Sequence, residues 1–112
     1  MNNRQKMYQT NSKIRKVLIK NGFEFLYFFP HLRFQKDYYL DGSDFDALGF
    51  KKGEKNIYFM QFKTNKKVPK KELLNYLKIE NKYNCKCLWI NYIKKEGVFL
   101  YNSKYPKGII MS

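Results

Sequence analysis

Acidic residues are scarce in this chain of 112 residues, and none occurs in its first 23 positions. Only nine Asp and Glu stand against 23 Lys and Arg, which gives a net charge of +14 and a pI near 9.8. Such an imbalance indicates a polyanionic partner, most simply nucleic acid. Because 20 of the 23 basic residues are Lys, codon bias in an AT-rich genome is a competing explanation, and both remain open.

Long apolar runs and paired cysteines are also missing. No run approaches the roughly 18 residues of a membrane-spanning helix, and no charged-then-apolar leader opens the chain. We therefore expect a cytoplasmic protein with no membrane partner. Cys85 and Cys87 alternate within an apolar segment, which favours buried, reduced thiols over a disulfide or a zinc site.

Aromatic residues, by contrast, are abundant. Ten Phe and ten Tyr belong to a hydrophobic fraction of 44%, which supplies a core and argues against disorder. At this length, roughly two-thirds of the unfolded surface can be buried on folding. We therefore expect a single folded domain over 1–112.

The hydrophobic pattern predicts a helix, three strands, a second helix and two further strands. In chain order these are a helix over 4–20, strands over 23–29, 44–50 and 57–64, a helix over 70–83, and strands over 87–93 and 98–103. A further strand is a candidate over 32–39, and residues 105–112 are left unassigned. This order predicts an α/β or α+β fold, in which helices flank a mixed central sheet.

Each expected helix has an apolar side. In the first helix it comprises Met7, Ile14, Val17 and Leu18, and in the second it comprises Leu73, Tyr76 and Leu77. The dipeptide at 21–22, Asn-Gly, ends the first helix. Pro69 is expected in the first turn of the second helix, where its missing N–H costs nothing.

The strands over 44–50 and 57–64 are expected to form a hairpin. If Phe50 and Ile57 form its closing pair, the numbers of opposed residues sum to 107. Directly opposed side chains lie on one face, with Cβ atoms about 5 Å apart. A slip of one residue would move one set to the other face. The register therefore decides whether the polar residues of the two strands meet.

All four aspartates lie within positions 37–46, and two of them enter this hairpin. In the expected register Asp46 faces Gln61, and Asp44 faces Lys63. Two carboxylates on one patch repel each other, so a hard divalent cation such as Mg²⁺ is the natural neutralising partner. Lys63 beside such an ion would orient an attacking water or stabilise developing charge. These are the parts of a phosphodiesterase.

Structural explanations exist for the same residues. Asp41 belongs to a "DGSD" turn and is expected to be structural. Asp44 and Lys63 would also suit a surface ion pair worth less than about 1 kcal/mol. Since both strands are otherwise apolar on both faces, however, a buried central hairpin is predicted, and a charge cluster there favours a functional role.

The segment "DFDALGF", a loop, "IYFMQFKT" and a following helix together resemble the PD-(D/E)xK nuclease superfamily. This superfamily has the restriction-endonuclease-like fold and includes archaeal Holliday-junction resolvases. Its pattern places an Asp at the start of the second core strand and an acid-x-Lys on the third. The order of helices and strands also resembles the family core, so the likeness spans about residues 5–103.

The resemblance implies a role for each matched residue. Asp46 matches the family Asp, Gln61 the acidic position and Lys63 the Lys, while Asp44 matches an auxiliary acid. Asp46, Gln61 and the backbone carbonyl of Phe62 would hold Mg²⁺ or Mn²⁺, with Asp44 as a further ligand. Lys63 would position the water that attacks the phosphodiester. The implied activity is that of a metal-dependent DNA endonuclease, similar to junction resolvases in its choice of DNA structures.

Two departures from the family pattern keep an alternative open. Gln61 replaces Asp or Glu, which removes a negative charge from the metal site, and the first helix has no Glu. Glu24, just beyond that helix, is a weak substitute. The alternative is a catalytically impaired module that binds nucleic acid with the same fold. A basic protein of the translation machinery is a third possibility, supported by charge alone.

Basic side chains near these elements are expected to grip phosphates, which orients DNA without reading its sequence. The candidates are Lys13, Lys16, Lys20, Arg33, Lys66, Lys67, Lys70 and Lys71. His31 and Trp89 are expected to be structural. Cleavage of both strands by so small a domain would need two active sites, so a homodimer with two-fold symmetry is expected.

Overall fold

The computed structural model describes residues 3–28, 39–40 and 43–111, and the side chains of 11–28 and 43–111. Its helices are α1 (Asn3–Lys20) and α2 (Lys70–Tyr83). Its strands are β1 (Phe23–Phe28), β2 (Tyr39–Leu40), β3 (Ser43–Asp44), β4 (Ala47–Lys51), β5 (Ile57–Thr64), β6 (Lys86–Ile93), β7 (Gly97–Tyr101) and β8 (Ile109–Met111). The predicted helices and the hairpin of β6 and β7 are therefore confirmed, with ends shifted by one or two residues.

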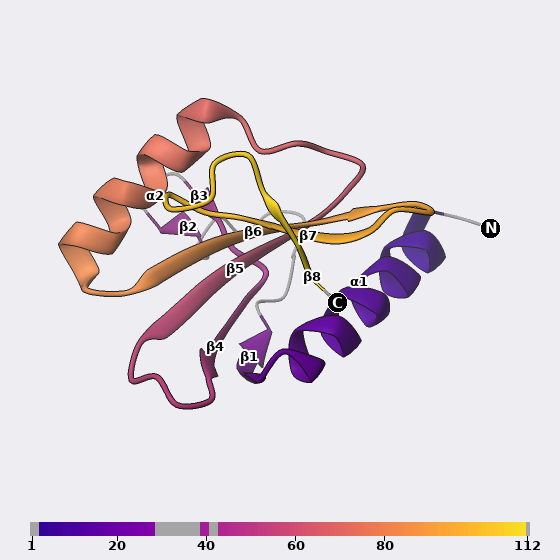
Figure 1. Cartoon of the computed structure of the whole chain (residues 1–112), viewed down its shortest axis with the longest axis horizontal. Helices are drawn as coiled ribbons and strands as arrows, with labels where there is room; N and C mark the ends of the chain where they lie inside the picture. The colour runs from indigo at the N-terminus through magenta and orange to yellow at the C-terminus, as the bar shows by residue number, and fades with distance from the viewer. Residues whose placement is uncertain (1–2, 29–38, 41–42, 112) are drawn as a thin grey trace.

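Six strands form one sheet in the order β1-β4-β5-β6-β7-β8 (Figure 1). Only β5 and β6 run parallel, because α2 connects them as a crossover, while the other neighbours are antiparallel. β2 and β3 form a separate two-stranded ladder. This mixed sheet flanked by helices confirms the expected fold class. None of the described helices is both long and apolar enough to cross a membrane.

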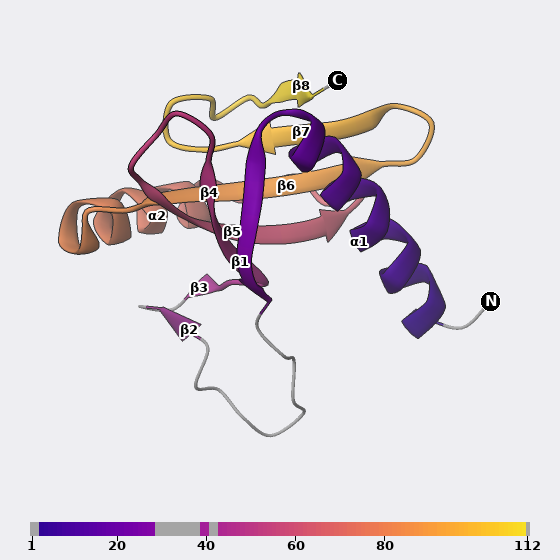
Figure 2. The same cartoon turned by 90° about the horizontal axis from the view of Figure 1, so that it is seen from below.

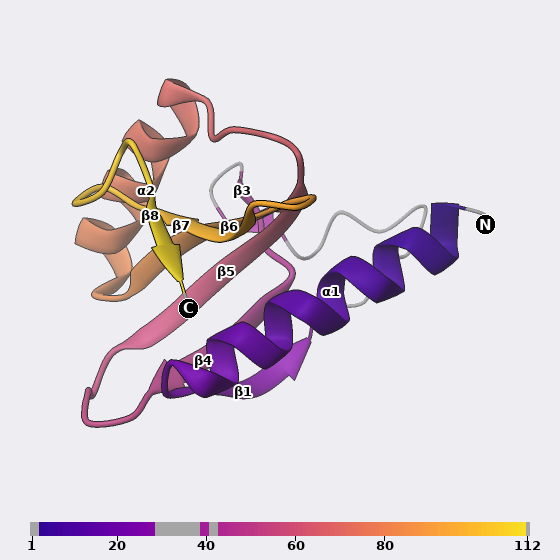
Figure 3. The same ribbon diagram turned by 45° about the vertical axis from the view of Figure 1, so that its right-hand side comes forward.

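The two helices cover opposite faces of the sheet (Figures 2 and 3). On one face, Ile14 and Leu18 of α1 are fully buried against apolar side chains that include Met60 and Phe62 of β5. On the other face, Tyr76 of α2 packs in a second cluster whose sheet members include Phe59, Cys87 and Trp89. Because side chains alternate along a strand, β5 gives Met60 and Phe62 to the α1 face and Phe59, Gln61 and Lys63 to the α2 face.

The predicted hairpin register is confirmed. Phe50 pairs with Ile57, and the ladder continues with the same sum of residue numbers to Ala47 and Met60. β4 nevertheless begins at Ala47 rather than at position 44. The expected pairing of Asp44 with Lys63 is wrong, because Asp44 lies in β3 and pairs with Tyr39.

Burial of Phe45 explains this bend. Phe45 is fully buried on the α2 side, where its ring stacks on Tyr76 at 5.8 Å between centroids and lies 5.2 Å from Phe59. A strand that continued straight would place position 45 on the α1 face, together with Ala47, and positions 44 and 46 on the α2 face. The chain bends instead, so that Phe45 reaches the core under α2.

Several smaller expectations also change. Leu77 is 43% exposed, whereas Ile79 is fully buried and completes the inner side of α2 with Leu73 and Tyr76. Pro69 caps α2 in an extended conformation, one position before its first turn. The unassigned C-terminal segment supplies the edge strand β8.

Other expectations cannot be placed. The candidate strand over 32–39 lies outside the described residues except for Tyr39, which belongs to β2. His31, Asp37 and Asp41 also lie outside them, as does the side chain of Met7.

Candidate active site

Asp46 stands at the point where β4 begins and holds on to β5 through both its backbone and its side chain. Its N–H donates to the carbonyl of Met60 at 2.8 Å, and its Oδ2 accepts from the N–H of Phe62 at 2.6 Å. The carboxylate thus takes the place of the backbone acceptor that a longer β4 would have offered to Phe62. Because the N–H and C=O of one strand residue point to the same edge, the carbonyl of Phe62 faces this side too.

Gln61 lies on the α2 face and is only 4% exposed. Its Oε1 accepts a hydrogen bond from the hydroxyl of Tyr76, and the carbonyl of Leu88 lies 3.4 Å from the same hydroxyl. Tyr76 reaches this position because the buried side of α2 faces the sheet. The expected pairing of Gln61 with Asp46 lies beyond the ladder of β4 and β5, which ends at Ala47 and Met60. The partner that binds the oxygen of Gln61 is Tyr76 of α2.

The pKa of Tyr76 is raised above its usual value, first by burial and then by negative charges that include Glu72 and Asp46. Burial disfavours the phenolate, and nearby carboxylates disfavour it further. The contribution from Asp46 indicates that its carboxylate lies within electrostatic range of the same hydroxyl that binds Gln61. Asp46 thus contributes to the electrostatic environment of the Tyr76 hydroxyl.

Lys63 follows Gln61 by two positions and therefore shares its face of β5. Its Nζ lies 5.4 Å from the centre of the Trp89 ring, which is within the range of a cation–π contact. Trp89 itself donates from its indole N–H to the carbonyl of Lys66 at 3.0 Å. Lys63 is a half-buried residue whose ammonium thus lies over an aromatic ring of the core.

Asn91 is the β6 partner of Lys63 and has no exposed surface. Its Oδ1 accepts from the backbone N–H of Lys66 at 3.0 Å, whereas its Nδ2 finds no hydrogen-bond partner among the described residues. Together with the Trp89 contact, this bond fastens the loop after β5 onto β6. The basic segment that follows Lys63 is therefore anchored by two side chains of the neighbouring strand.

A second group of polar contacts ties β3 to α2. Ser43 is 1% exposed, donates to Oε1 of Glu72 at 2.7 Å and accepts from Nδ2 of Asn75 at 2.7 Å. Ser43 immediately precedes Asp44, which is half-buried and paired away from Lys63. These bonds fix the segment that leads into Asp46.

The oxygen atoms of this arrangement suit a hard divalent cation. The carboxylate of Asp46, the carbonyl of Phe62 and the amide oxygen of Gln61 are donors of the type that Mg²⁺ and Mn²⁺ accept. No group of three His, Cys, Asp or Glu side chains suited to a metal occurs among the described residues. The donors thus fit such a cation in chemical type, and the carboxylate of Asp46 bonds directly to this stretch of β5.

The basic residues expected to bind DNA fall at two ends of the sheet. Lys66, Lys67, Lys70 and Lys71 are exposed in the loop after β5 and the first turn of α2. Lys13 of α1 reaches the same end, because its Nζ donates to the hydroxyl of Tyr92 while the carbonyl of Tyr92 accepts from Asn65.

Lys20 lies at the other end of α1, beside the turn where Gly22 bonds Lys52. Lys16 is exposed on α1 between Lys13 and Lys20, and Arg33 lies outside the described residues. The predicted set is therefore divided: Lys13 and the basic loop lie at one end of the sheet, and Lys20 lies at the other.

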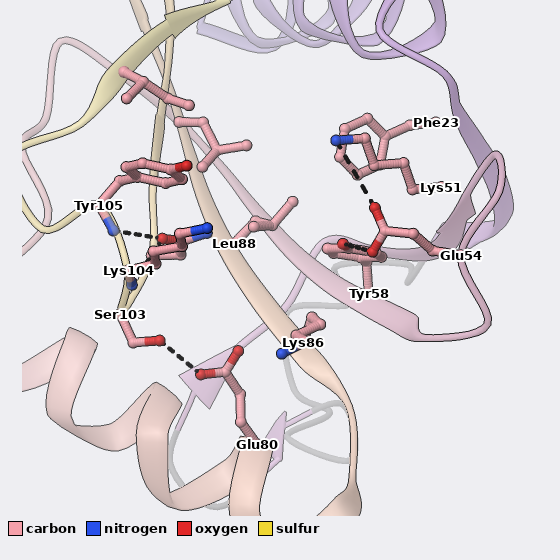
Figure 4. Close-up of a pocket in the computed structure, with 13 residues that line it drawn as sticks. Phe23, Lys51, Glu54, Tyr58, Glu80, Lys86, Leu88, Ser103, Lys104 and Tyr105 are labelled. Atoms are coloured by element: carbon pink, nitrogen blue, oxygen red, sulfur yellow. Dashed lines mark hydrogen bonds and ion pairs between the residues drawn. The ribbon is translucent and has the colours of Figure 1, made fainter.

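A separate pocket of about 370 Å³ opens near the first residues of β5 and β6 (Figure 4). Both carboxylates that line it already interact with neighbouring side chains. Glu54 accepts from Tyr58 at 2.6 Å and lies 3.9 Å from Lys51, and Glu80 accepts from Ser103 at 3.1 Å. None of the predicted site residues lines this pocket, so it is distinct from the candidate active site.

Sequence reasoning placed Tyr76 in the core but missed its contact with Gln61, and it missed Asn91. A signal existed for both. A buried Tyr needs a partner for its hydroxyl, and Asn91 interrupts an otherwise apolar strand, where an amide must find hydrogen bonds. Which partner each would find depends on how α2 and β6 lie against β5, which the sequence pattern leaves open.

Comparison with models of protein families and with curated protein sequences finds no match. Among solved structures, this chain is similar to Hjc, a Holliday junction resolvase from the archaeal hyperthermophile Archaeoglobus fulgidus. The TM-score is 0.62 at 10% sequence identity, and the alignment covers 92% of this chain and 94% of that one. A likeness at this identity concerns the fold alone. The chain thus has the restriction-endonuclease-like fold that its sequence pattern implied.

Proposed function

We propose that this protein is a metal-dependent DNA endonuclease that hydrolyses phosphodiester bonds. The observation that carries the proposal is the bond from the Phe62 N–H to the carboxylate of Asp46, which sets an acid against β5 between Gln61 and Lys63. The similar fold of a Holliday junction resolvase supports the same chemistry and favours branched DNA as the substrate.

Asp46, Gln61 and the Phe62 carbonyl would hold Mg²⁺ or Mn²⁺, with Asp44 as an auxiliary acid. A bound cation of this kind stabilises charge on the scissile phosphate and makes a water molecule more acidic. The hydrogen bond from Phe62 fixes the direction of the Asp46 carboxylate, which is the part the protein contributes before any ligand arrives. Gln61 carries no charge where the related motif has an acid, which predicts weak affinity for the ion.

Lys63 would position the attacking water and stabilise the charge that develops on phosphate oxygens. Its ammonium lies over Trp89, so the side chain is already ordered near the end of β5. A preorganised cation of this kind loses little conformational freedom when substrate binds. We therefore assign Lys63 the catalytic role.

DNA would approach from the end of the sheet where the loop after β5 and Lys13 of α1 both bond to Tyr92. Lys66, Lys67 and Lys13 are exposed there, and Lys70 and Lys71 lie in the first turn of α2, whose N-terminus also favours phosphate. Neutralised phosphates release counterions, so binding should weaken steeply with salt. Since two cuts need two active sites, we also propose that a homodimer acts on branched DNA.

A cleavage assay tests the proposal. Nicking of supercoiled plasmid and cutting of a four-way junction are measured with Mg²⁺, with Mn²⁺ and with EDTA. Cleavage should require the metal, and Lys63→Ala should lower its rate by about 10²-fold or more. Lys86→Ala is the matched control, because Lys86 is an exposed lysine at the opposite end of the sheet.

The competing function is a nucleic-acid-binding module with an impaired site. One observation favours it: the oxygen of Gln61 accepts from Tyr76, and the residue carries no charge. DNA binding without cleavage in any metal would establish this function in place of the first. Nicking that persists in EDTA, or that survives in Lys63→Ala, would contradict the proposed mechanism.

A further inference from the structure

The turn between β6 and β7 carries two lysines that were not among the residues expected to bind DNA. Lys94 and Lys95 follow the end of β6, and both are exposed. β6 pairs with β5 as far as Tyr92 and Thr64, so the turn lies just beyond the end of β5 that carries Lys63. Figure 3 shows this turn beside the loop after β5.

Asn65 joins the turn to that loop by two hydrogen bonds. Its backbone N–H donates to the carbonyl of Tyr92 at 2.8 Å, and its Oδ1 accepts from the backbone N–H of Lys94 at 3.2 Å. Asn65 has a φ of 51°, a left-handed conformation that Asn adopts more readily than most residues. One residue therefore fixes the β6–β7 turn against the segment that leads to Lys66 and Lys67.

The backbone of Lys95 favours glycine, yet the residue is a lysine. Its φ is 70°, where a Cβ atom crowds the backbone and only glycine escapes the cost. The side chain is exposed, so packing does not explain a lysine at this position. A conformational cost carried by an exposed charged residue favours a role in binding over one in stability.

The charges around the turn suit an anionic partner. Lys13 of α1 donates to the hydroxyl of Tyr92 at 3.0 Å, and Lys66 and Lys67 are exposed in the loop after β5. Glu96, exposed in the same turn, opposes them with a negative charge. Duplex DNA carries a phosphate charge about every 1.7 Å along its axis. A row of ammonium groups from segments that lie side by side can therefore contact successive phosphates.

We propose that the β6–β7 turn is a DNA-binding element in which Lys94 and Lys95 contact phosphates. Asn65 is a positioning residue, because it aligns the turn with the neighbouring basic loop. The inference rests on the proposed function for the identity of the ligand, DNA, and is independent of the metal and of cleavage. It extends the phosphate-binding surface to a second segment, about 30 positions further along the chain.

Binding of a fluorescently labelled four-way DNA junction, measured by anisotropy in EDTA, tests the inference. The Kd is followed from about 50 to 200 mM salt for the parent protein, Lys94→Ala and Lys95→Gly. Each variant should bind about fivefold more weakly near about 0.15 M salt and should lower the slope of log K against log salt by about one. Lys55→Gly is the matched control, because Lys55 is exposed in the loop between β4 and β5, at the opposite end of the sheet.

Thermal unfolding separates binding from stability. Lys95→Gly relieves the left-handed conformation, so its Tm should be close to or above that of the parent protein while its affinity for DNA falls. Glu96→Gln removes the opposing charge of the turn and should tighten binding by about twofold.

Asn65→Gly tests the positioning role, because glycine keeps the positive φ and removes only the side-chain acceptor. Hydrogen exchange at the N–H of Lys94 should become faster. Affinity for the junction should fall by about twofold with an unchanged salt slope, because every lysine remains. Unchanged affinity in this variant would overturn the positioning role of Asn65.

The two proposals fail differently in these experiments. A parent protein that binds no DNA would overturn both. An affinity and a salt slope like those of the parent in both Lys94→Ala and Lys95→Gly would overturn the role of the turn and leave binding by the loop after β5 standing. A Tm of Lys95→Gly that falls together with its affinity would also overturn the inference, since the lysine would then serve the fold.

Discussion

The two faces of the sheet differ in the polarity of the side chains that they bury. Under α1 the buried cluster consists of apolar side chains and Tyr58, such as Ile14, Leu18 and Met60. Under α2 lie the buried polar residues, Gln61 and Asn91 on the strands and Ser43 in β3. Burying a polar group costs free energy unless it is hydrogen-bonded, so a face that gathers several of them is expected to serve more than stability.

The α1 face thus mainly stabilises the fold, whereas the α2 face carries the candidate site. β5 contributes to both at once, because alternate residues face opposite sides: Met60 and Phe62 pack under α1, while Gln61 and Lys63 face α2. Phe62 takes part in both, because its ring packs in the α1 cluster and its backbone N–H binds Asp46. The core on one side thus fixes the strand that carries the candidate site on the other.

The largest effect on stability is expected from the α1 face. Leu18→Ala removes a fully buried side chain and should lower the free energy of unfolding by about 2–5 kcal/mol. Ile19→Ala, at a neighbouring position that is 58% exposed, should change it by less than about 0.5 kcal/mol. Urea denaturation measures both. A nearly unchanged free energy of unfolding in Leu18→Ala would contradict the view that the α1 face stabilises the fold.

A smaller and more local effect is expected on the α2 face. Asn91→Ala removes the acceptor for the backbone N–H of Lys66 and should cost about 1–3 kcal/mol. Its distinguishing sign is faster hydrogen exchange at Lys66, because the loop after β5 loses one of its two anchors. Exchange at Lys66 that stays unchanged while global stability falls would mean that Asn91 serves only the core.

The smallest effect concerns alkaline pH and compares a tyrosine from each face. Burial is the first cause that raises the pKa of both Tyr76 and Tyr58, with neighbouring carboxylates adding to it. The folded protein therefore keeps a proton that the unfolded chain loses above about pH 10. The stability from this source is complete below that pH and declines as the pH rises further.

Tyr76 should contribute at most about 1.4 kcal/mol per pH unit to that decline, and Tyr58, whose hydroxyl is less deeply buried, a smaller amount. Unfolding free energies of Tyr76→Phe and Tyr58→Phe, measured between about pH 9 and pH 11, should each show a shallower fall than those of the parent protein. A parent slope retained in Tyr76→Phe would show that its hydroxyl is not protected in the fold.

Local sequence signals predicted what depends on neighbours along the chain. Turn residues and short loops predict the end of α1 just before Gly22, the start of α2 just after Pro69, and the closing pair of Phe50 and Ile57. The fold class then follows from the order of elements. The register near the hairpin turn was predictable for the same reason, but the ladder stops at Ala47 and Met60, before the expected pair of Asp46 and Gln61.

Contacts between distant elements decided what the sequence left open. The bend before Ala47 arises because Phe45 meets Tyr76, which is 31 positions away in the chain, and a straight strand was the simpler expectation. The inner side of α2 was mistaken at Leu77 for a similar reason: helical spacing allows either Leu77 or Ile79, and packing on the sheet selects Ile79. The partner of Gln61 was likewise set by tertiary packing.

The bend at Phe45 has a consequence for access to β5. If β4 ran straight through position 45, its backbone would pair with Phe62 and seal the carbonyl there within a continuous ladder. Because Phe45 turns into the core under α2, the backbone of β4 does not pair with Phe62, and the carboxylate of Asp46 lies beside that edge of β5. Under the proposed function, an aromatic side chain of the core would thereby decide whether the carbonyl of Phe62 is available to a cation.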